Sequence, residues 1–225
     1  MTSQPTSIKL YTFKSPNGQK ISILFRLLGI DFEIVKVDLT KGEQKTPEFK
    51  KLNPSETIPV VEFVDSNGVK QIFGESAVIM KYFLDHYDTN YQYHYPNSDP
   101  LFYEQYHWEI FQAATLGPSL VTNFIAKLTN VTGVGRKEFL KRVNKYYDIL
   151  DQQIAKNGTG YIIGDKLSAV DVAFYSWATM YPQTAENDWD SVPNIKKWVD
   201  LLSEHPAIQK GTADVNDAFP DFSFS

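Results

Sequence analysis

The strongest constraint on the fold is a change in hydrophobic period partway along the chain. Residues 8–86 alternate between runs of β-branched and aromatic residues, typical of strands, and segments whose apolar residues recur every three or four positions, typical of helices. Residues 87–100, YDTNYQYHYPNSDP, follow neither period and contain two prolines, which predicts a linker. Every segment after this linker has the helical period. The sequence therefore predicts an α+β domain over residues 8–87, a linker over residues 88–100 and an all-α helical domain over residues 101–215.

The first domain is predicted to have the order βαβ-α-ββα. A helix separates the first two strands, so they would run parallel, whereas the last two are joined by DSNG, residues 65–68, and would form an antiparallel hairpin. Thr46 followed by Pro47 predicts the start of the short middle helix. The predicted strands cover residues 8–13, 31–39, 57–64 and 69–73, and the predicted helices cover residues 18–29, 46–54 and 74–87.

The helical half contains one strong local signal. Ser168 and Asp171 have the spacing of a capping box, in which each side chain satisfies a backbone N–H at a helix start. Leu167 and Val172 occupy the matching hydrophobic-staple positions. We therefore interpret Ser168 and Asp171 as structural caps. The other predicted helices cover residues 101–117 and 135–158, and a last one begins near residue 193.

Composition excludes several functions. The 225 residues include no cysteine, so disulfides, catalytic thiols and thiolate metal sites are ruled out, and the four histidines lack zinc-site spacing. The net charge of −5 and the absence of a basic tract argue against nucleic acid as a partner. No run of about 18 apolar residues occurs, so no membrane partner is expected. Without an export signal, the expected location is cytoplasmic.

Three segments together resemble the glutathione transferase family: ETIPVVEF, GESAVIMKYF and YIIGDKLSAVDVAF. The resemblance covers roughly residues 8–210 and implies a thioredoxin-like first domain followed by an all-helical one. Three further segments, SPNGQK, KGEQKTPEFKKLNP and HWEIFQAATLGP, narrow the resemblance to the fungal nitrogen-regulator-like (prion-type) branch and its bacterial nu-type relatives. The regulator carries a long Asn-rich extension, and this chain begins about seven residues before its first strand. We therefore expect an enzyme rather than an aggregating regulator.

The resemblance assigns the residues that would bind glutathione. Ile58, before Pro59, would pair its backbone with the cysteinyl part. Glu75 and Ser76 would hold the γ-glutamyl end, because a helix start offers free N–H groups and a positive dipole end to a carboxylate. Taken alone, these two residues would only begin a helix. For the glycyl part, Gln44 is the matching position, and either Lys45 or Lys41 would pair with the glycyl carboxylate.

The glutathione sulfur is predicted to lie beside the SPNG turn, residues 15–18. Only a few per cent of a free thiol is ionised at neutral pH, so the protein must donate hydrogen bonds to the thiolate. Asn17 matches the position of the branch's catalytic asparagine, and Ser15 lies near the serine of other transferases. A shift of one residue would put Lys14 there instead, and Tyr11 is a weaker alternative. The same residue types also make plain turns, and Gly18 would let a ligand approach the backbone closely.

The predicted function is conjugation of the glutathione thiolate to hydrophobic electrophiles, with glutathione as co-substrate and no metal. Trp108 and Phe111 would line the electrophile pocket, although aromatic residues at helical spacing are also typical of a core. Two alternatives stay open: glutathione-dependent reduction of disulfides or peroxides, and a non-catalytic glutathione-binding module. The resemblance also implies a homodimer.

Overall fold

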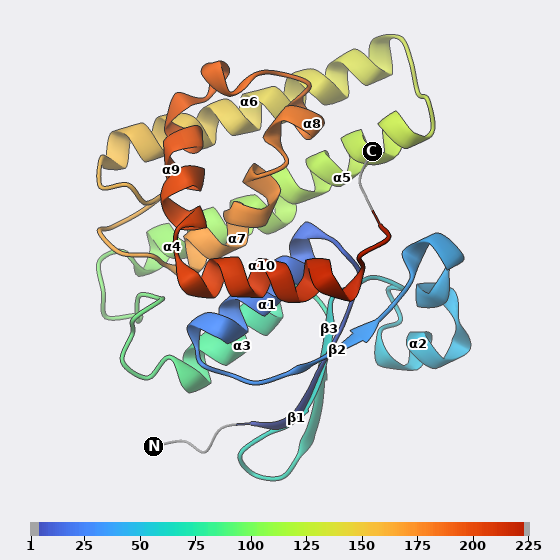
Figure 1. Cartoon of the computed structure of the whole chain (residues 1–225). Coiled ribbons are helices and arrows are strands. Elements are labelled where there is room, and N and C mark those ends of the chain that lie inside the picture. The colour runs from blue at the N-terminus through green and yellow to red at the C-terminus, as the bar shows by residue number, and fades with distance from the viewer. Residues whose placement is uncertain (1–4, 223–225) are drawn as a thin grey trace. The chain divides into compact units, whose positions relative to one another are not determined.

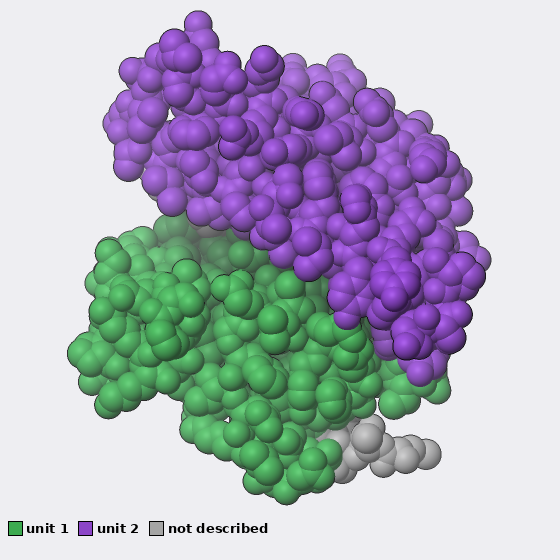
Figure 2. Space-filling view, turned by 180° about the vertical axis from the view of Figure 1, so that it is seen from behind, with its two compact units in different colours: residues 1–90, 204–225 green, residues 91–203 purple. Residues whose placement is uncertain are grey.

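The computed structural model describes residues 5–222 (Figure 1). They divide into two compact units, distinguished by colour in Figure 2. Unit 1 comprises the chain up to Asn90 together with the residues from Glu204 onward, and unit 2 comprises Tyr91–Ser203. The first boundary falls within the predicted linker. The second differs from the expected one, because the residues after Ser203 group with unit 1 rather than with the helical half.

Unit 1 is built on a four-stranded mixed sheet in the order β2-β1-β3-β4. As predicted, β1 and β2 are parallel, and β3 and β4 form an antiparallel hairpin. The Asp65 carboxylate closes the hairpin by accepting from the backbone N–H groups of Asn67 and Val69, at 2.9 and 3.0 Å. The strands are β1 (Thr6–Thr12), β2 (Glu33–Lys36), β3 (Val60–Val64) and β4 (Lys70–Phe73). The helices are α1 (Pro16–Leu27), α2 (Pro47–Leu52), α3 (Ser76–Tyr87) and α10 (Pro206–Ala218), with short 3₁₀ turns η1 (Leu39–Lys41) and η2 (Glu43–Lys45).

Helix α10 belongs to unit 1 because it packs closely along α1 (Figure 1). Gly211 makes this approach possible: a Cβ atom there would lie 2.5 Å from Cα of Ile23, far inside van der Waals contact. Arg26 of α1 reinforces the contact through an ion pair with Asp214, with 2.6 Å between Nε and Oδ2. In the sequence, this helix was not distinguished from the predicted helix that begins near residue 193.

Unit 2 is entirely helical. The segment predicted to end at residue 117 continues instead, because the π-helical turn η3 (Gln112–Leu116) leads directly into another helix. Pro118 lies within the first two residues of that helix. The elements are α4 (Phe102–Phe111), α5 (Gly117–Leu128), α6 (Val134–Asn157), α7 (Ala169–Ala178), α8 (Tyr181–Ala185), the 3₁₀ turn η4 (Trp189–Ser191) and α9 (Pro193–Ser203).

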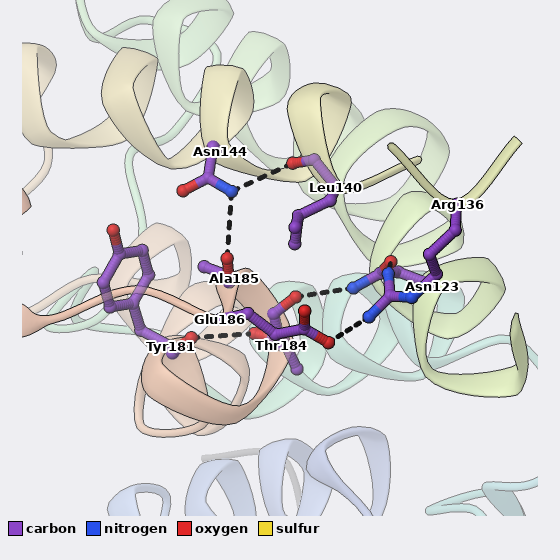
Figure 3. A network of polar contacts seen from close by, with 8 residues as sticks. All are labelled: Asn123, Arg136, Leu140, Asn144, Tyr181, Thr184, Ala185 and Glu186. Atoms are coloured by element: carbon purple, nitrogen blue, oxygen red, sulfur yellow. Dashed lines mark hydrogen bonds and ion pairs between the residues drawn. The ribbon is translucent and has the colours of Figure 1, made fainter. Parts of the chain in front are cut away.

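A polar network fastens the end of α8 to α5 and α6 (Figure 3). The Arg136 guanidinium donates to the Asn123 side chain and forms an ion pair with Glu186. Asn144 donates to the backbone carbonyl of Ala185 at 3.0 Å. The close packing of the three helices removes these polar groups from water, and the contacts replace the hydrogen bonds that they would make to water.

The predicted capping box is confirmed. Asp171 is fully buried and accepts from the N–H and hydroxyl groups of Ser168, each at 2.9 Å. Its other oxygen accepts from the Ile162 N–H at 3.0 Å and from Nε1 of Trp198 at 2.9 Å. These donors favour the charged form, but burial outweighs them and raises the pKa of Asp171 to about 6.

Residues 5–222 lack two features that would indicate a membrane or metal partner. No helix there combines the length and the apolar character needed to cross a membrane. The same residues contain no cluster of histidine and acidic side chains arranged to hold a metal ion.

Replacing Gly211 with alanine should destabilise unit 1. The added methyl group overpacks the α1–α10 contact, so we expect the free energy of unfolding to fall by about 1–3 kcal/mol. Gly135→Ala in α6 is the matched control, since no atom lies within 4 Å of a Cβ there. Its expected effect is neutral to stabilising, by up to about 1 kcal/mol. Urea unfolding followed by circular dichroism measures both, and equal effects would contradict the packing argument.

Asp171 should make stability depend on pH in an unusual direction. Between its ordinary pKa of 3.8 and the folded value of about 6, the folded protein keeps a proton that the unfolded chain releases. The contribution of this group to the free energy of unfolding therefore decreases as pH rises through that window, by at most roughly 3 kcal/mol. Unfolding of the protein and of Asp171→Asn should be compared from pH 4 to pH 8. The difference between their free energies of unfolding should decrease up to about pH 6 and then stay constant. A difference that grows with pH would contradict the raised pKa of Asp171.

Candidate functional site

The register of the sheet defines the site. Tyr11 near the end of β1 lies opposite Val60 at the start of β3, and Val61 lies opposite Phe73 at the end of β4. The end of β1, the start of β3 and the end of β4 therefore meet at one edge of the sheet. Because β2 is parallel to β1, it also ends at this edge. The segments that leave this edge contain every glutathione-binding residue predicted in unit 1.

The turn after β1 presents Ser15 and Asn17. Ser15 is the N-cap of α1, and its hydroxyl oxygen accepts from the N–H of Gly18 at 3.2 Å, which leaves the hydroxyl hydrogen available for donation. Asn17 is the second residue of the helix and is half-buried. A Cβ atom on Gly18 would lie 2.0 Å from Oγ1 of the buried Thr12. Glycine is therefore required for α1 to start so close to the strand.

Lys14, the alternative donor to the sulfur at this turn, makes its hydrogen bond to another segment. Its ammonium group donates to the backbone carbonyl of Phe222 at 2.8 Å. The neighbouring Phe13 ring packs edge-on against Phe219 and Phe222, with centroids 5.0 and 4.5 Å apart. The segment after α10 thus holds the residues that precede Ser15.

Tyr11, the weaker alternative, packs within unit 1. It lies against a small apolar cluster made by Val37, Phe49 and Val60. Burial is the main cause that raises the pKa of its hydroxyl. Ser15 and Asn17 therefore remain the better candidates for a residue that donates to a thiolate.

The turn before β3 is held by a residue that the sequence analysis missed. The Ile58–Pro59 peptide bond is cis. Asn53 is buried, and its side-chain amide donates to the carbonyl of Thr57 at 2.8 Å. A Cβ atom on Gly74, directly before Glu75, would lie 3.1 Å from the same amide nitrogen. Asn53 therefore supports two of the predicted binding segments, although in the sequence its only signal was a position at the end of a short helix.

Glu75 and Ser76 form the start of α3. Glu75 is exposed and has φ of 60° and ψ of 107°, a conformation that non-glycine residues rarely adopt. Such strain costs of order 1–3 kcal/mol and concentrates at functional sites. The Ser76 hydroxyl accepts from the ammonium group of Lys20 at 3.1 Å. Lys20 is the second residue that the sequence analysis missed, because it looked like one lysine of an amphipathic helix.

Gln44 and Lys45 lie in η2, after β2. The Oε1 atom of Gln44 is buried and has no hydrogen-bond partner among residues 5–222. An unpaired buried acceptor costs about 1–3 kcal/mol, which a donor from a ligand would recover. Lys45 is exposed.

Trp108 and Phe111 belong to α4 in unit 2. Trp108 is buried, with ring centroids 5.5 Å from Phe111 and 6.2 Å from Phe174. Phe111 is half-buried and also packs edge-on against Tyr146, at 5.7 Å. Tyr146 is in turn one wall of a cavity of about 320 Å³ in unit 2. The cavity is lined by Ala114, Thr115, Pro118, Ser119, Thr122, Phe139, Arg142 and Tyr146.

Comparison with known proteins identifies the family. Residues 14–86 match the glutathione S-transferase N-terminal domain, and residues 122–210 match the glutathione S-transferase C-terminal domain. A glutathione transferase homologue from Lodderomyces elongisporus, solved with two GSH per subunit, is 31% identical. The alignment covers 93% of this chain and 99% of that one, with a TM-score of 0.85. The chain therefore belongs to the glutathione S-transferase family.

Two further relatives place the chain within the family. The glutathione transferase URE2P6 from Phanerochaete chrysosporium, solved with oxidized glutathione, is 26% identical, with a TM-score of 0.85 and coverage of 94% of this chain and 97% of that one. The disulfide-bond oxidoreductase YfcG of Escherichia coli is 25% identical over 89% of this chain and 92% of its own length. The resemblance to the fungal regulator-like and bacterial branch is thus confirmed.

Proposed function

We propose that this protein binds glutathione in unit 1 and transfers its thiolate to hydrophobic electrophiles. The sheet register carries the proposal, because it gathers at one edge the turn at Ser15–Asn17, the Ile58–Pro59 turn and the start of α3. Each of these segments would bind a different part of glutathione, because each carries groups that complement that part. Family membership and a relative solved with GSH support the choice of ligand.

The γ-glutamyl end would bind at the start of α3. Its α-carboxylate would accept from the Ser76 hydroxyl and from the first backbone N–H groups of the helix, where the dipole favours an anion. The Glu75 carboxylate would accept from the α-ammonium group. The strained conformation of Glu75 supports a functional role for this residue.

The other two parts of glutathione would bind along the same edge. Ile58 would pair its backbone N–H and carbonyl groups with the cysteinyl part. Gln44 would bind the glycyl part, and its unpaired buried oxygen supports that role. Lys45 would pair with the terminal carboxylate.

Asn17 would activate the thiol. Its amide donates to the sulfur, and the positive end of the α1 dipole adds to the stabilisation of the thiolate. Ser15 shapes the turn as the N-cap that accepts from the Gly18 N–H, and its hydroxyl hydrogen is the alternative donor to the sulfur. In conjugation to an aryl halide, a carbon–sulfur bond forms, the carbon–halogen bond breaks, halide leaves and the thiol proton passes to solvent.

The electrophile would bind on unit 2. Trp108 and Phe111 are proposed for this surface, with Trp108 acting from the core as support for Phe111. The neighbouring cavity offers aromatic rings together with hydroxyl groups and the Arg142 guanidinium, so it would also accept a polar or anionic second substrate.

Disulfide reduction is the second candidate. It is favoured by the similarity to a disulfide-bond oxidoreductase and to a transferase solved with oxidized glutathione. The bound thiolate would attack the glutathionyl sulfur of a mixed disulfide, form oxidised glutathione and release the other thiolate. This reaction needs no protein cysteine.

A glutathione-affinity column followed by two assays tests these proposals. The protein should bind and elute with free glutathione, and failure to bind would remove both reactions. The same preparation should then be assayed with an aryl halide and with a mixed glutathione disulfide. Binding without either reaction would instead favour the non-catalytic module.

Asn17→Ala should raise the pKa of the bound thiol by about one unit, equivalent to about 1.4 kcal/mol, and lower kcat/KM for conjugation about tenfold at neutral pH. Titration of the thiolate absorbance of the complex measures the pKa. Ser15→Ala is the control: it should cost about 1 kcal/mol of stability through the lost N-cap, with a smaller effect on the thiol. If the pKa of the bound thiol rises in Ser15→Ala and stays unchanged in Asn17→Ala, the roles of the two residues are the reverse of those proposed.

The apolar residues exposed on each unit support a homodimer. Val69 directly before β4, Ile72 within β4 and Val78 of α3 are 51%, 37% and 51% exposed. On α4, Tyr103 and Ile110 are 80% and 56% exposed and share a face because they are seven residues apart. Groups of exposed apolar residues are typical of an interface.

Light scattering should therefore give a mass near twice the 25.7 kDa of one chain. Val78→Lys and Ile110→Asp should shift the protein toward monomer, because each would bury a charge in the interface. Leu201→Asp, at an exposed apolar position of α9, should leave the mass unchanged. A wild-type mass near that of a single chain would rule out the dimer.

A further inference from the structure

Lys20 is almost fully buried, an unusual state for a lysine. It lies on the second turn of α1, three residues after Asn17 and therefore on the same helix face. Its side chain is only 1% exposed, so the ammonium group has lost its hydration. Buried lysines are rare because that loss must be offset by specific polar contacts. One such contact is the hydrogen bond of 3.1 Å from Nζ to Oγ of Ser76.

This contact fixes the direction of the Ser76 hydroxyl. An ammonium group has three donors and no acceptor, whereas a hydroxyl group both donates and accepts. Oγ of Ser76 must therefore be the acceptor toward Lys20, and its own hydrogen must point away from Nζ. A hydroxyl that accepts from a cation is also polarised and becomes a stronger donor.

The hydroxyl hydrogen of Ser76, which remains free to donate, lies at the start of α3. Ser76 is the first residue of this helix of 12 residues, so its hydroxyl lies beside the N–H groups that the first helical turn leaves unpaired. Lys20 adds a buried positive charge behind it. All three features favour an anion at Ser76, whereas Glu75, the preceding residue, favours a cation.

We propose that Lys20 is a positioning residue that holds Ser76 as a donor and thereby makes the site select ligands with a carboxylate at the γ-glutamyl end. The inference rests on the proposed binding of glutathione and deepens it. The two charged groups of the γ-glutamyl end are recognised separately: the α-carboxylate by Ser76 backed by Lys20, and the α-ammonium group by Glu75.

Two glutathione analogues separate these contributions. Glutaryl-Cys-Gly keeps the carboxylate and lacks the ammonium group, whereas 4-aminobutanoyl-Cys-Gly keeps the ammonium group and lacks the carboxylate. Calorimetry with the whole chain should show that Lys20→Met lowers the affinity for glutathione and for glutaryl-Cys-Gly about tenfold. Its affinity for 4-aminobutanoyl-Cys-Gly should be unchanged. In the conjugation assay, KM for glutathione should rise about tenfold with little change in kcat, since the lost interaction is made equally in the ground and transition states.

Coupling to Ser76 distinguishes positioning from a general structural role. If Lys20 acts through Ser76, then Lys20→Met should add little to the loss caused by Ser76→Ala, because neighbouring residues that act together are not additive. Lys20→Arg keeps a donor-only cation and should keep the carboxylate preference. Lys210→Met, which removes a lysine paired with Asp214 on α10, is the matched control and should bind all three ligands normally.

The outcomes are distinct. Equal losses for all three ligands, or full additivity with Ser76→Ala, would overturn the role of Lys20 while leaving glutathione binding intact. A wild-type protein that does not bind glutathione would overturn the proposed function and this inference with it. If Lys20→Met does not fold, Lys20→Gln replaces it. Its amide can also accept from Ser76, so the same selective loss is expected, and an unchanged carboxylate preference would refute the proposal.

Discussion

The antiparallel pairing of β1 with β3 is the constraint on which the site depends. It places the end of β1 beside the start of β3, and the β3–β4 hairpin then brings the start of α3 to the same edge. A shift of one residue would turn each side chain of a strand to the opposite face and separate these segments. The buried residues Leu10, Val61 and Phe63 make such a shift costly, because it would expose them to water.

Two helix starts share this edge, and their polarity explains its chemistry. Helices α1 and α3 both begin there, so each presents N–H groups and the positive end of its dipole at this edge. Glutathione would supply the complementary anions, a thiolate at α1 and a carboxylate at α3. The contact between Lys20 and Ser76 joins the second turn of α1 to the start of α3, so one buried cation links the two helices at this edge.

Local signals in the sequence predicted most elements of unit 1 but fewer boundaries in unit 2. Ser168 and Asp171 were recognised because a capping box is defined by residue types three positions apart. The continuation of α4 through η3 into α5 was missed, because Gly117 and Pro118 are typical of a helix end as well as of a helix start. The grouping of α10 with α1 was missed as well, because it depends on Gly211 meeting Ile23 across nearly the whole chain.

The sequence by itself determined the order of strands and helices over residues 8–87, the turn at Ser15–Asn17 and the pair Glu75–Ser76, because period, caps and turn residues act over a few positions. Only the tertiary structure decided which side chains support them. Asn53 and Lys20 look unremarkable in the sequence, yet one holds the turn before Pro59 and the other donates to Ser76. Burial and hydrogen bonding between distant segments arise only when the sheet and helices pack. The physical role of a buried lysine therefore cannot be read from its neighbours in the chain.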